Sequence, residues 1–180
     1  LKPSQKLDLA LILAPPDSLC VGTFTQSQVR AECIDLSLDR LTKTEGRIRA
    51  ILVNSGQANA CTGKRGLGDS LIATKAVAET TGLLEEEILM CSTGVIGQPI
   101  PIQNLINGVP SLVNALSREG GSDAAQAILT TDLCEKQIAI EGFLGDKCVR
   151  IGGMAKGSGM IHPCMATMLG FLTCDVGLPK

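Results

Sequence analysis

Aromatic residues and charge are both scarce in this sequence. Its 180 residues include no Trp, no Tyr and three Phe, and 19% of them are charged against 44% that are hydrophobic. The core must therefore be built from aliphatic and sulfur-containing side chains. The 16 basic and 18 acidic residues are scattered along the chain and leave a net charge of -2. Nucleic-acid binding needs a basic stripe and, for single strands, stacking aromatics, so the composition argues against this class of function.

Long apolar runs, histidine and closely paired cysteines are also missing. Runs such as Leu9 to Ala14 are far shorter than the ~20 residues that span a bilayer, which argues against a membrane role. The first six residues contain neither an initiator Met nor an apolar signal-peptide core, so we expect residues to be missing before them. A single His and the absence of a Cys-x-x-Cys pair leave little to bind a metal. We expect the eight cysteines to be buried thiols of a reducing, cytoplasmic compartment.

Turn signals divide the first half of the chain into short apolar runs. Leu7 to Leu13 and Val21 to Thr25 flank a Pro-Pro-Asp turn, which predicts two neighbouring strands, and Ile48 to Asn54 predicts a third. Asp69 is suited to cap a helix, and Gly82 is placed to end it. The apolar positions that predict this helix are Leu71, Ile72, Ala76 and Ala78.

The second half alternates in the same way. Ile88 to Met90 predicts a strand, Pro101 the first turn of a helix that Pro110 interrupts, and Ser122 the cap of a further helix. Three more strands are predicted at Gln137 to Ile140, Lys147 to Ile151 and Met168 to Thr173, the first two joined as a hairpin around Gly145 and Asp146. The sequence therefore predicts a mixed α/β sandwich that forms a single domain over residues 1–180.

The densest unusual segment runs from Gly152 to Asp175. Five glycines in it surround Lys156, and a Pro-Cys-Met-Ala stretch then leads to Thr167. Glycines at this density let backbone amides approach a ligand closely, and a lysine among them adds positive charge. A phosphate-binding loop would have these features too. However, Lys156 precedes Gly157 and Ser158 without the upstream glycine of the Gly-x-x-x-x-Gly-Lys-Ser/Thr pattern.

Four segments together resemble one enzyme family. The sequence AKGSGMIHPCMATML, from Ala155 to Leu169, closely resembles the self-cleavage segment of the ornithine acetyltransferases. Three other segments match the same family in the same order: NSGQANACTG (Asn54 to Gly63), STGVIG (Ser92 to Gly97) and AILTTD (Ala127 to Asp132). Cys164 departs from the Asn that the family often carries beside the cut. The resemblance implies the N-terminal half of such an enzyme and its mixed sheet sandwich, which is also that of DmpA-like aminopeptidases.

The resemblance assigns the nucleophile to Thr167. In the family, the bond that corresponds to Ala166-Thr167 is cut, so residues 1–166 would form an α chain and residues 167–180 would begin a β chain. A threonine hydroxyl is a weak nucleophile until a base takes its proton, and an N-terminal threonine can use its own α-amino group, with a pKa of about 7.7 to 8. In the uncut chain this nitrogen is an amide. Cleavage therefore creates the catalyst, and His162 is left without a proton to move.

The resemblance also assigns the groups around the reacting carbonyl. Thr93 and Gly94 match the pair that stabilises the oxyanion of the tetrahedral intermediate, a role that needs preorganised donors. Thr130 and Lys156 match residues that contact the amino-acid substrate, together with Thr167 itself. A lysine ammonium suits the α-carboxylate of that substrate.

The implied function is acetyl transfer. N-acetylornithine would acetylate Thr167, and glutamate would then take the acetyl group, which makes the protein a glutamate N-acetyltransferase of arginine biosynthesis. The resemblance implies no cofactor and no metal, with acetyl-CoA as a further acetyl donor in bifunctional members. It implies a heterotetramer of two α and two β chains. Two alternatives stay open: a self-processing aminopeptidase of the same architecture, and a noncatalytic glycine-rich nucleotide-binding domain.

Overall fold

Two three-stranded sheets organise the chain, which the computed structural model describes over residues 6–158 and 168–177. The first sheet has the order β1-β2-β3, with β1 antiparallel to β2 and β2 parallel to β3. The second sheet has the order β4-β5-β6 and is antiparallel throughout. Their bounds are Leu9–Leu13 (β1), Ala50–Gln57 (β2), Ile88–Val95 (β3), Lys136–Leu144 (β4), Lys147–Lys156 (β5) and Leu169–Cys174 (β6).

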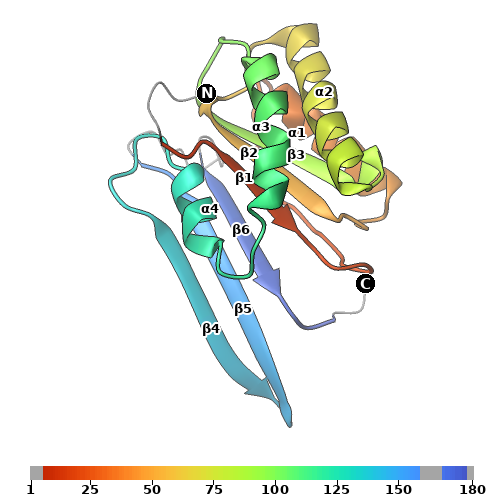
Figure 1. Ribbon diagram of the computed structural model, residues 1–180, viewed down its shortest axis with the longest axis vertical. Coiled ribbons are helices and arrows are strands. Elements are labelled where there is room, and N and C mark those ends of the chain that lie inside the picture. The colour runs from red at the N-terminus through yellow and green to blue at the C-terminus, as the bar shows by residue number, and fades with distance from the viewer. Residues whose placement is uncertain (1–5, 159–167, 178–180) are drawn as a thin grey trace.

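Helices cover the first sheet on one face, and the second sheet lies on its other side. Three helices pack together on the first face: α1 (Glu32–Lys43), α2 (Gly63–Thr81) and α3 (Ile102–Asn114) (Figure 1). The short helix α4 (Gly121–Ala127) and strands β5 and β6 lie on the opposite side (Figure 1). The predicted mixed α/β sandwich is therefore confirmed, with the first sheet as its middle layer.

The strands of the first sheet are apolar on both faces because both faces are covered. Leu52 and Ala50 of β2 point to the large core beneath α1, α2 and α3, while Val53 and Ile51 point to a smaller core beside α4 and the second sheet. Full burial of one such side chain contributes about 1.5 to 3 kcal/mol. Successive residues of a strand point to opposite faces, and here both faces meet a core. The strand therefore appears in the sequence as a continuous apolar run rather than as an alternation of apolar and polar residues.

The predicted strand from Val21 to Thr25 is wrong. This segment forms no strand, and Val21 is 94% exposed. The backbone amides of Ala14 and Cys20 instead donate to the carbonyl oxygens of Arg49 and Gly46, which lie before β2. The partner of β1 is therefore β2, far along the chain, rather than the next apolar run.

Helix α2 begins six residues before the cap predicted at Asp69. Asp69 lies buried inside the helix, where burial raises the pKa of its carboxyl group and the charge of Arg65 opposes that rise. The predicted apolar face is wrong at Leu71 and Ile72, which are exposed, and right at Ala78, which is buried. Mostly small residues form the buried face: Gly66, Ser70, Ala73, Thr74, Val77 and Ala78. Gly82 ends the helix as predicted, in the left-handed conformation with φ +74°.

Two predictions for the later helices also need correction. Helix α3 starts after Pro101 as predicted but continues through Pro110, because Leu105 and Val109 are fully buried in the large core. That burial outweighs the roughly 3 kcal/mol that an internal proline costs a helix. Ser122 is not the cap of α4, which is Gly120, and its hydroxyl donates to the carboxylate of Glu135.

The cysteines follow the prediction only in part. The seven that the structure describes are free thiols, as expected. Cys33 is buried, and burial raises the pKa of its thiol to about 11. Four others are exposed, contrary to the expectation of buried thiols: Cys61, Cys134, Cys148 and Cys174. Within residues 6–158 and 168–177, no helix is both long and apolar enough to cross a membrane.

Candidate functional site

A buried lysine joins three segments that are distant in the sequence. Lys156 is the last residue of β5, and its ammonium donates to the Oγ1 of Thr93 at 2.9 Å and to the Oγ1 of Thr130 at 2.8 Å. Thr93 lies near the end of β3, and Thr130 lies in the connection between α4 and β4. The structure therefore brings together three of the residues predicted to form the site.

The charge of Lys156 is enclosed. Lys156 is only 3% exposed. Burial lowers the pKa of its amino group because a buried cation loses its hydration. The negative charge of Asp132 opposes this shift, while the positive charge of Lys136 adds to it. An ammonium has three N–H donors, and the two threonine hydroxyls take two of them. Within the described residues, the third donor is available to a ligand such as a carboxylate.

The backbone beside Thr93 approaches its neighbour unusually closely. Gly94 stands opposite Gly56 in the parallel pairing of β2 and β3, and it has φ +134°. A Cβ atom added to Gly94 would lie 2.3 Å from both the carbonyl carbon and the carbonyl oxygen of Gly56. Only glycine fits this backbone conformation and this contact. The close pairing of β2 and β3 at their ends therefore requires glycine at position 94 of the motif.

Polar residues at the end of β2 support this pair of strands, and sequence reasoning assigned them no role. The hydroxyl of Ser92 donates to the Oδ1 of the fully buried Asn54 at 2.6 Å, and the Nδ2 of Asn54 donates to the carbonyl of Gln57. The hydroxyl of Ser55 donates to the carbonyl of Ala127 at 2.5 Å. The motif beginning at Asn54 therefore ties β2 to β3 and to α4. Its polar composition inside an apolar strand was the available signal.

Asp132 is a further residue whose role the sequence did not reveal. Its Oδ1 accepts hydrogen bonds from the backbone amide of Gly157 at 2.9 Å and from the ammonium of Lys136. Its side chain is completely buried, whereas that of Lys136 is half exposed. Burial alone would raise the pKa of Asp132, but these hydrogen bonds and the charges of Lys136 and Lys156 outweigh it and lower the pKa. Its position at the end of the AILTTD motif was the only signal in the sequence.

The predicted nucleophile and cut lie outside the described residues. Ala166 and Thr167 fall in the segment 159–167, as do His162 and Cys164. On either side of this segment the chain is described, and Lys156 of β5 pairs with Leu169 of β6. The described residues that flank segment 159–167 are therefore neighbours, and they lie at the site formed by Lys156, Thr93 and Thr130.

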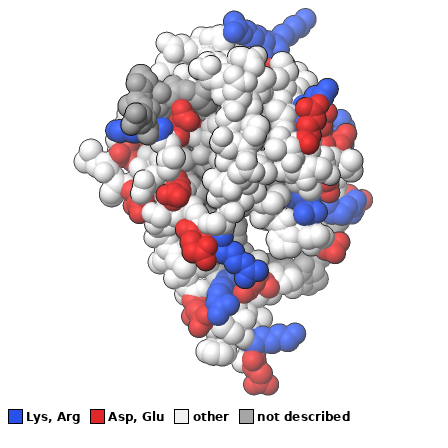
Figure 2. All heavy atoms as spheres, viewed as in Figure 1, with Lys and Arg blue, Asp and Glu red and all other residues white. Residues whose placement is uncertain are grey.

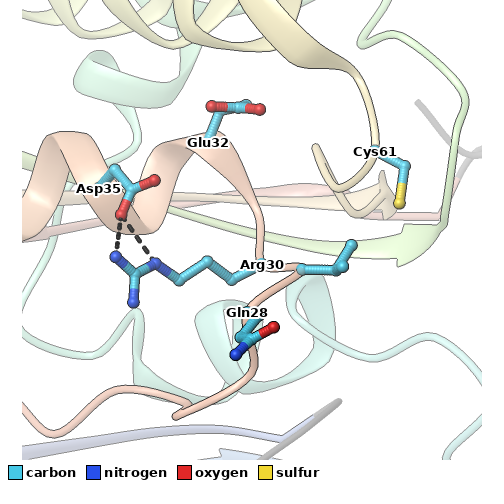
Figure 3. A pocket seen from close by; sticks show the side chains of 6 residues that line it. Gln28, Arg30, Glu32, Asp35 and Cys61 are labelled. Atoms are coloured by element: carbon cyan, nitrogen blue, oxygen red, sulfur yellow. Dashed lines mark hydrogen bonds and ion pairs between the residues drawn. The ribbon is translucent and has the colours of Figure 1, made fainter.

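A shallow hollow at the start of α1 is distinct from this site. It is lined by Gln28, Val29, Arg30, Glu32, Asp35 and Cys61 (Figure 3). The guanidinium of Arg30 turns to Asp35, with which it makes an ion pair of 2.6 Å, so its charge is already matched (Figure 3). None of the residues predicted to act in catalysis or substrate binding lines this hollow.

Charge is mixed on the face of the molecule that Figure 2 displays. Acidic and basic side chains alternate there, and the middle of this face is uncharged (Figure 2). Arg150 of β5 and Glu141 of β4 form an ion pair across the two strands, with a distance of 2.7 Å. This face therefore offers no continuous basic stripe of the kind that binds a nucleic-acid backbone.

Comparison with known proteins gives one consistent result. The family model described as "ArgJ family" matches residues 1–180. An Arginine biosynthesis bifunctional protein ArgJ of Prochlorococcus marinus is 72% identical over 180 residues, which are 100% of this chain and 44% of that protein. The chain thus spans less than half the length of this curated relative.

Two crystal structures resemble the chain in fold. One is the Arginine biosynthesis bifunctional protein argJ from Bacillus halodurans, with a TM-score of 0.80 and 39% identity over 88% of this chain and 83% of that one. The other is the ornithine acetyltransferase from Mycobacterium tuberculosis, crystallised with ornithine, with a TM-score of 0.79 and 38% identity over 90% of this chain and 86% of that one.

Proposed function

The chain belongs to the ArgJ family, and from that premise we propose that its full-length protein transfers an acetyl group from N-acetylornithine to glutamate. The single observation that carries the proposal is the buried ammonium of Lys156, held by Thr93 and Thr130 beside Gly94. Both substrates are amino acids with a free α-carboxylate. A buried cation with a spare donor suits that shared group, and the neighbouring strand end suits the developing oxyanion.

Thr167 is the proposed nucleophile. Its oxygen attacks the acetyl carbonyl carbon of N-acetylornithine, and its proton passes through the α-amino group of Thr167 to the departing nitrogen of ornithine. The C–O bond to Thr167 forms as the C–N bond breaks. The amino group of glutamate then attacks the acetyl carbonyl carbon of acetyl-threonine and loses a proton to the same α-amino group. The C–O bond to Thr167 breaks as the C–N bond forms, the α-amino group returns the proton to the Thr167 oxygen, and N-acetylglutamate leaves. Both steps pass through an oxyanion, which Thr93 and Gly94 stabilise.

Cleavage between Ala166 and Thr167 supplies the free α-amino group. The lengths of the relatives support this step: the chain covers 86% of the crystallised M. tuberculosis chain but only 44% of the P. marinus protein. The crystallised chain is therefore about half as long, as a chain released by cleavage would be. After cleavage β6 belongs to the second chain, and its six residue pairs with β5 keep the two chains in one sheet.

The C-terminal part of the same precursor is the proposed partner. One face of the sheet β4-β5-β6 carries exposed apolar side chains, among them Ile138 at 64% and Leu172 at 82% exposure. The other members of this face, by strand alternation and register, are Ile140, Leu144, Val149 and Ile151. The ion pair of Arg150 and Glu141 lies on the opposite face. A continuous apolar face needs a covering layer, which the C-terminal part supplies in the proposed assembly of two α and two β chains.

The proposal is tested by mass spectrometry of the full-length protein mixed with N-acetylornithine. We expect a chain that begins at Thr167 and gains the mass of one acetyl group, which glutamate then removes as N-acetylglutamate. Removal by water alone would favour the self-processing aminopeptidase. A protein that gains no acetyl group but binds ATP would favour the nucleotide-binding domain. The same measurement with acetyl-CoA identifies whether it is a second donor.

Replacing Lys156 tests the carboxylate role. In the full-length protein, Lys156→Met keeps the buried stem but removes the charge, so we expect KM to rise about 10- to 100-fold for both N-acetylornithine and glutamate, the range of a charge-assisted hydrogen bond. Because burial lowers the pKa of Lys156, KM in the unchanged enzyme should also rise toward alkaline pH, as the ammonium loses its proton. Lys75→Met, at a lysine of α2 whose side chain is 60% exposed, is the control. An effect on only one substrate would contradict the shared role.

A further inference from the structure

We propose that Asp132 is a positioning residue for acyl transfer: it fixes the end of β5 at Gly157 and so holds the ammonium of Lys156 on Thr93 and Thr130. This inference rests on the proposed function, because it concerns the same site. It assigns a role to a buried carboxylate that the proposed reaction does not otherwise use. Asp132 acts through Lys156 and takes no direct part in the chemistry.

The first support is the geometry of the corner at Gly157. Lys156 is the last paired residue of β5, and the chain leaves the sheet at Gly157 with φ +155°, a conformation that L side chains rarely adopt. The amide of Gly157 donates to the Oδ1 of Asp132 at 2.9 Å. This bond fixes the peptide that directly follows Lys156. The backbone that carries the Lys156 side chain is therefore held on both sides: by strand pairing with β6 before it and by the hydrogen bond to Asp132 after it.

The second support is the place from which Asp132 acts. Asp132 follows Thr130 by two residues in the connection between α4 and β4, so one short segment supplies both an acceptor for Lys156 and the acceptor for Gly157. Lys136, the first residue of β4, holds the same carboxylate oxygen from the other side. A single displacement of this segment would move both acceptors together.

The third support is electrostatic. The side chain of Asp132 is fully enclosed, and its Oδ2 accepts no hydrogen bond from any residue that the structure describes. Its negative charge therefore faces two positive charges, those of Lys136 and Lys156, both of which lower its pKa. Three influences decide the protonation of Lys156: burial and Lys136 favour the neutral amine, and Asp132 favours the ammonium. Without Asp132, Lys156 would lose its proton at a lower pH.

The test measures kcat/KM for acetyl transfer against pH in the full-length protein. Asp132→Asn keeps the shape and an oxygen for Gly157 but removes the charge. We expect KM to rise about tenfold for both substrates, and the alkaline fall of kcat/KM to begin about one pH unit lower. Asp132→Glu should restore part of this loss. Asp146→Asn removes the same charge in the distant β4–β5 turn and should change neither quantity.

A second variant tests the other charge that acts on the pKa of Lys156. Lys136→Gln removes a positive charge that lies at a half-exposed surface, so it should move the alkaline fall to higher pH. A purely structural role for Asp132 would reduce stability or yield and leave the alkaline limb of Asp132→Asn in place, which would overturn the proposal. If Asp132→Asn does not fold, Asp132→Glu decides: an unchanged KM for both substrates despite the displaced carboxylate would overturn the proposal. Failure of the unchanged enzyme to form acetyl-threonine would instead reject the proposed function itself.

Discussion

Thr167→Ala is expected to abolish both cleavage of the precursor and acetyl transfer. The same hydroxyl attacks the preceding carbonyl in cleavage and the acetyl carbonyl in transfer, so one substitution removes both reactions. Loss of a covalent nucleophile typically lowers kcat by about 10⁴-fold or more, which is the fall we expect here. Gel electrophoresis should show one uncut chain, and mass spectrometry should find no acetyl adduct.

Two further variants sharpen this prediction. Thr167→Ser keeps the oxygen and should still cleave and transfer, more slowly, because it loses the methyl group that restricts the rotamer. Thr173→Ala removes a threonine of β6 whose hydroxyl makes only a long contact of 3.4 Å to Gly152, so cleavage and transfer should persist. Appreciable acetyl transfer by Thr167→Ala would refute the assignment of the nucleophile.

Gly94→Ala is expected to be the most damaging substitution among the described residues of the site. The new Cβ would meet the backbone of Gly56 at 2.3 Å, and backbone atoms of a paired strand cannot move aside as a flexible side chain can. The positive φ of Gly94 adds strain for any L residue. We expect the free energy of unfolding to fall by about 2 to 4 kcal/mol, as for an overpacked core with a strained backbone. Denaturant unfolding of the full-length protein measures this loss.

Activity should fall more than stability accounts for. If Gly94 stands at the proposed oxyanion site, spreading the ends of β2 and β3 misplaces a donor, and loss of one donor costs about 10²- to 10³-fold in kcat. Gly97→Ala is the matched control: Gly97 also has a positive φ, of +77°, but an added Cβ meets nothing within 4 Å. It should show the backbone strain alone. Equal loss of kcat in both variants would argue against a specific role for Gly94.

Local sequence signals placed most of the strands and the breaks between them. The apolar runs at β1, β2, β3 and β6, and the hairpin turn at Gly145 with φ +62°, were predicted close to their observed positions. They were predictable because alternation, β-branched residues and glycine act within a few residues of chain. The same reasoning failed for Val21 to Thr25 and for Pro110, where long-range pairing and burial override local preference.

Helix α2 shows a second kind of failure. Its buried face consists largely of glycine, serine, alanine and threonine, while its leucine and isoleucine near Asp69 are exposed. A search for large apolar side chains at helical spacing therefore selects the wrong face. Close packing of α2 against α1 and α3 requires small residues, and this requirement depends on the neighbouring helices rather than on α2 itself.

The sequence by itself determined the family, through four motifs, and it contains the residues proposed to carry acyl transfer: Thr93, Gly94, Thr130, Lys156 and Thr167. Only the tertiary structure decided that Lys156 is buried and that its ammonium joins two threonines 63 and 26 residues away. It likewise singled out Asp132, for which the sequence offered only its place at the end of the AILTTD motif. The physical reason is that residue type sets what a group can do, whereas burial and neighbouring charge set its protonation and direction, and these come from segments distant in the chain.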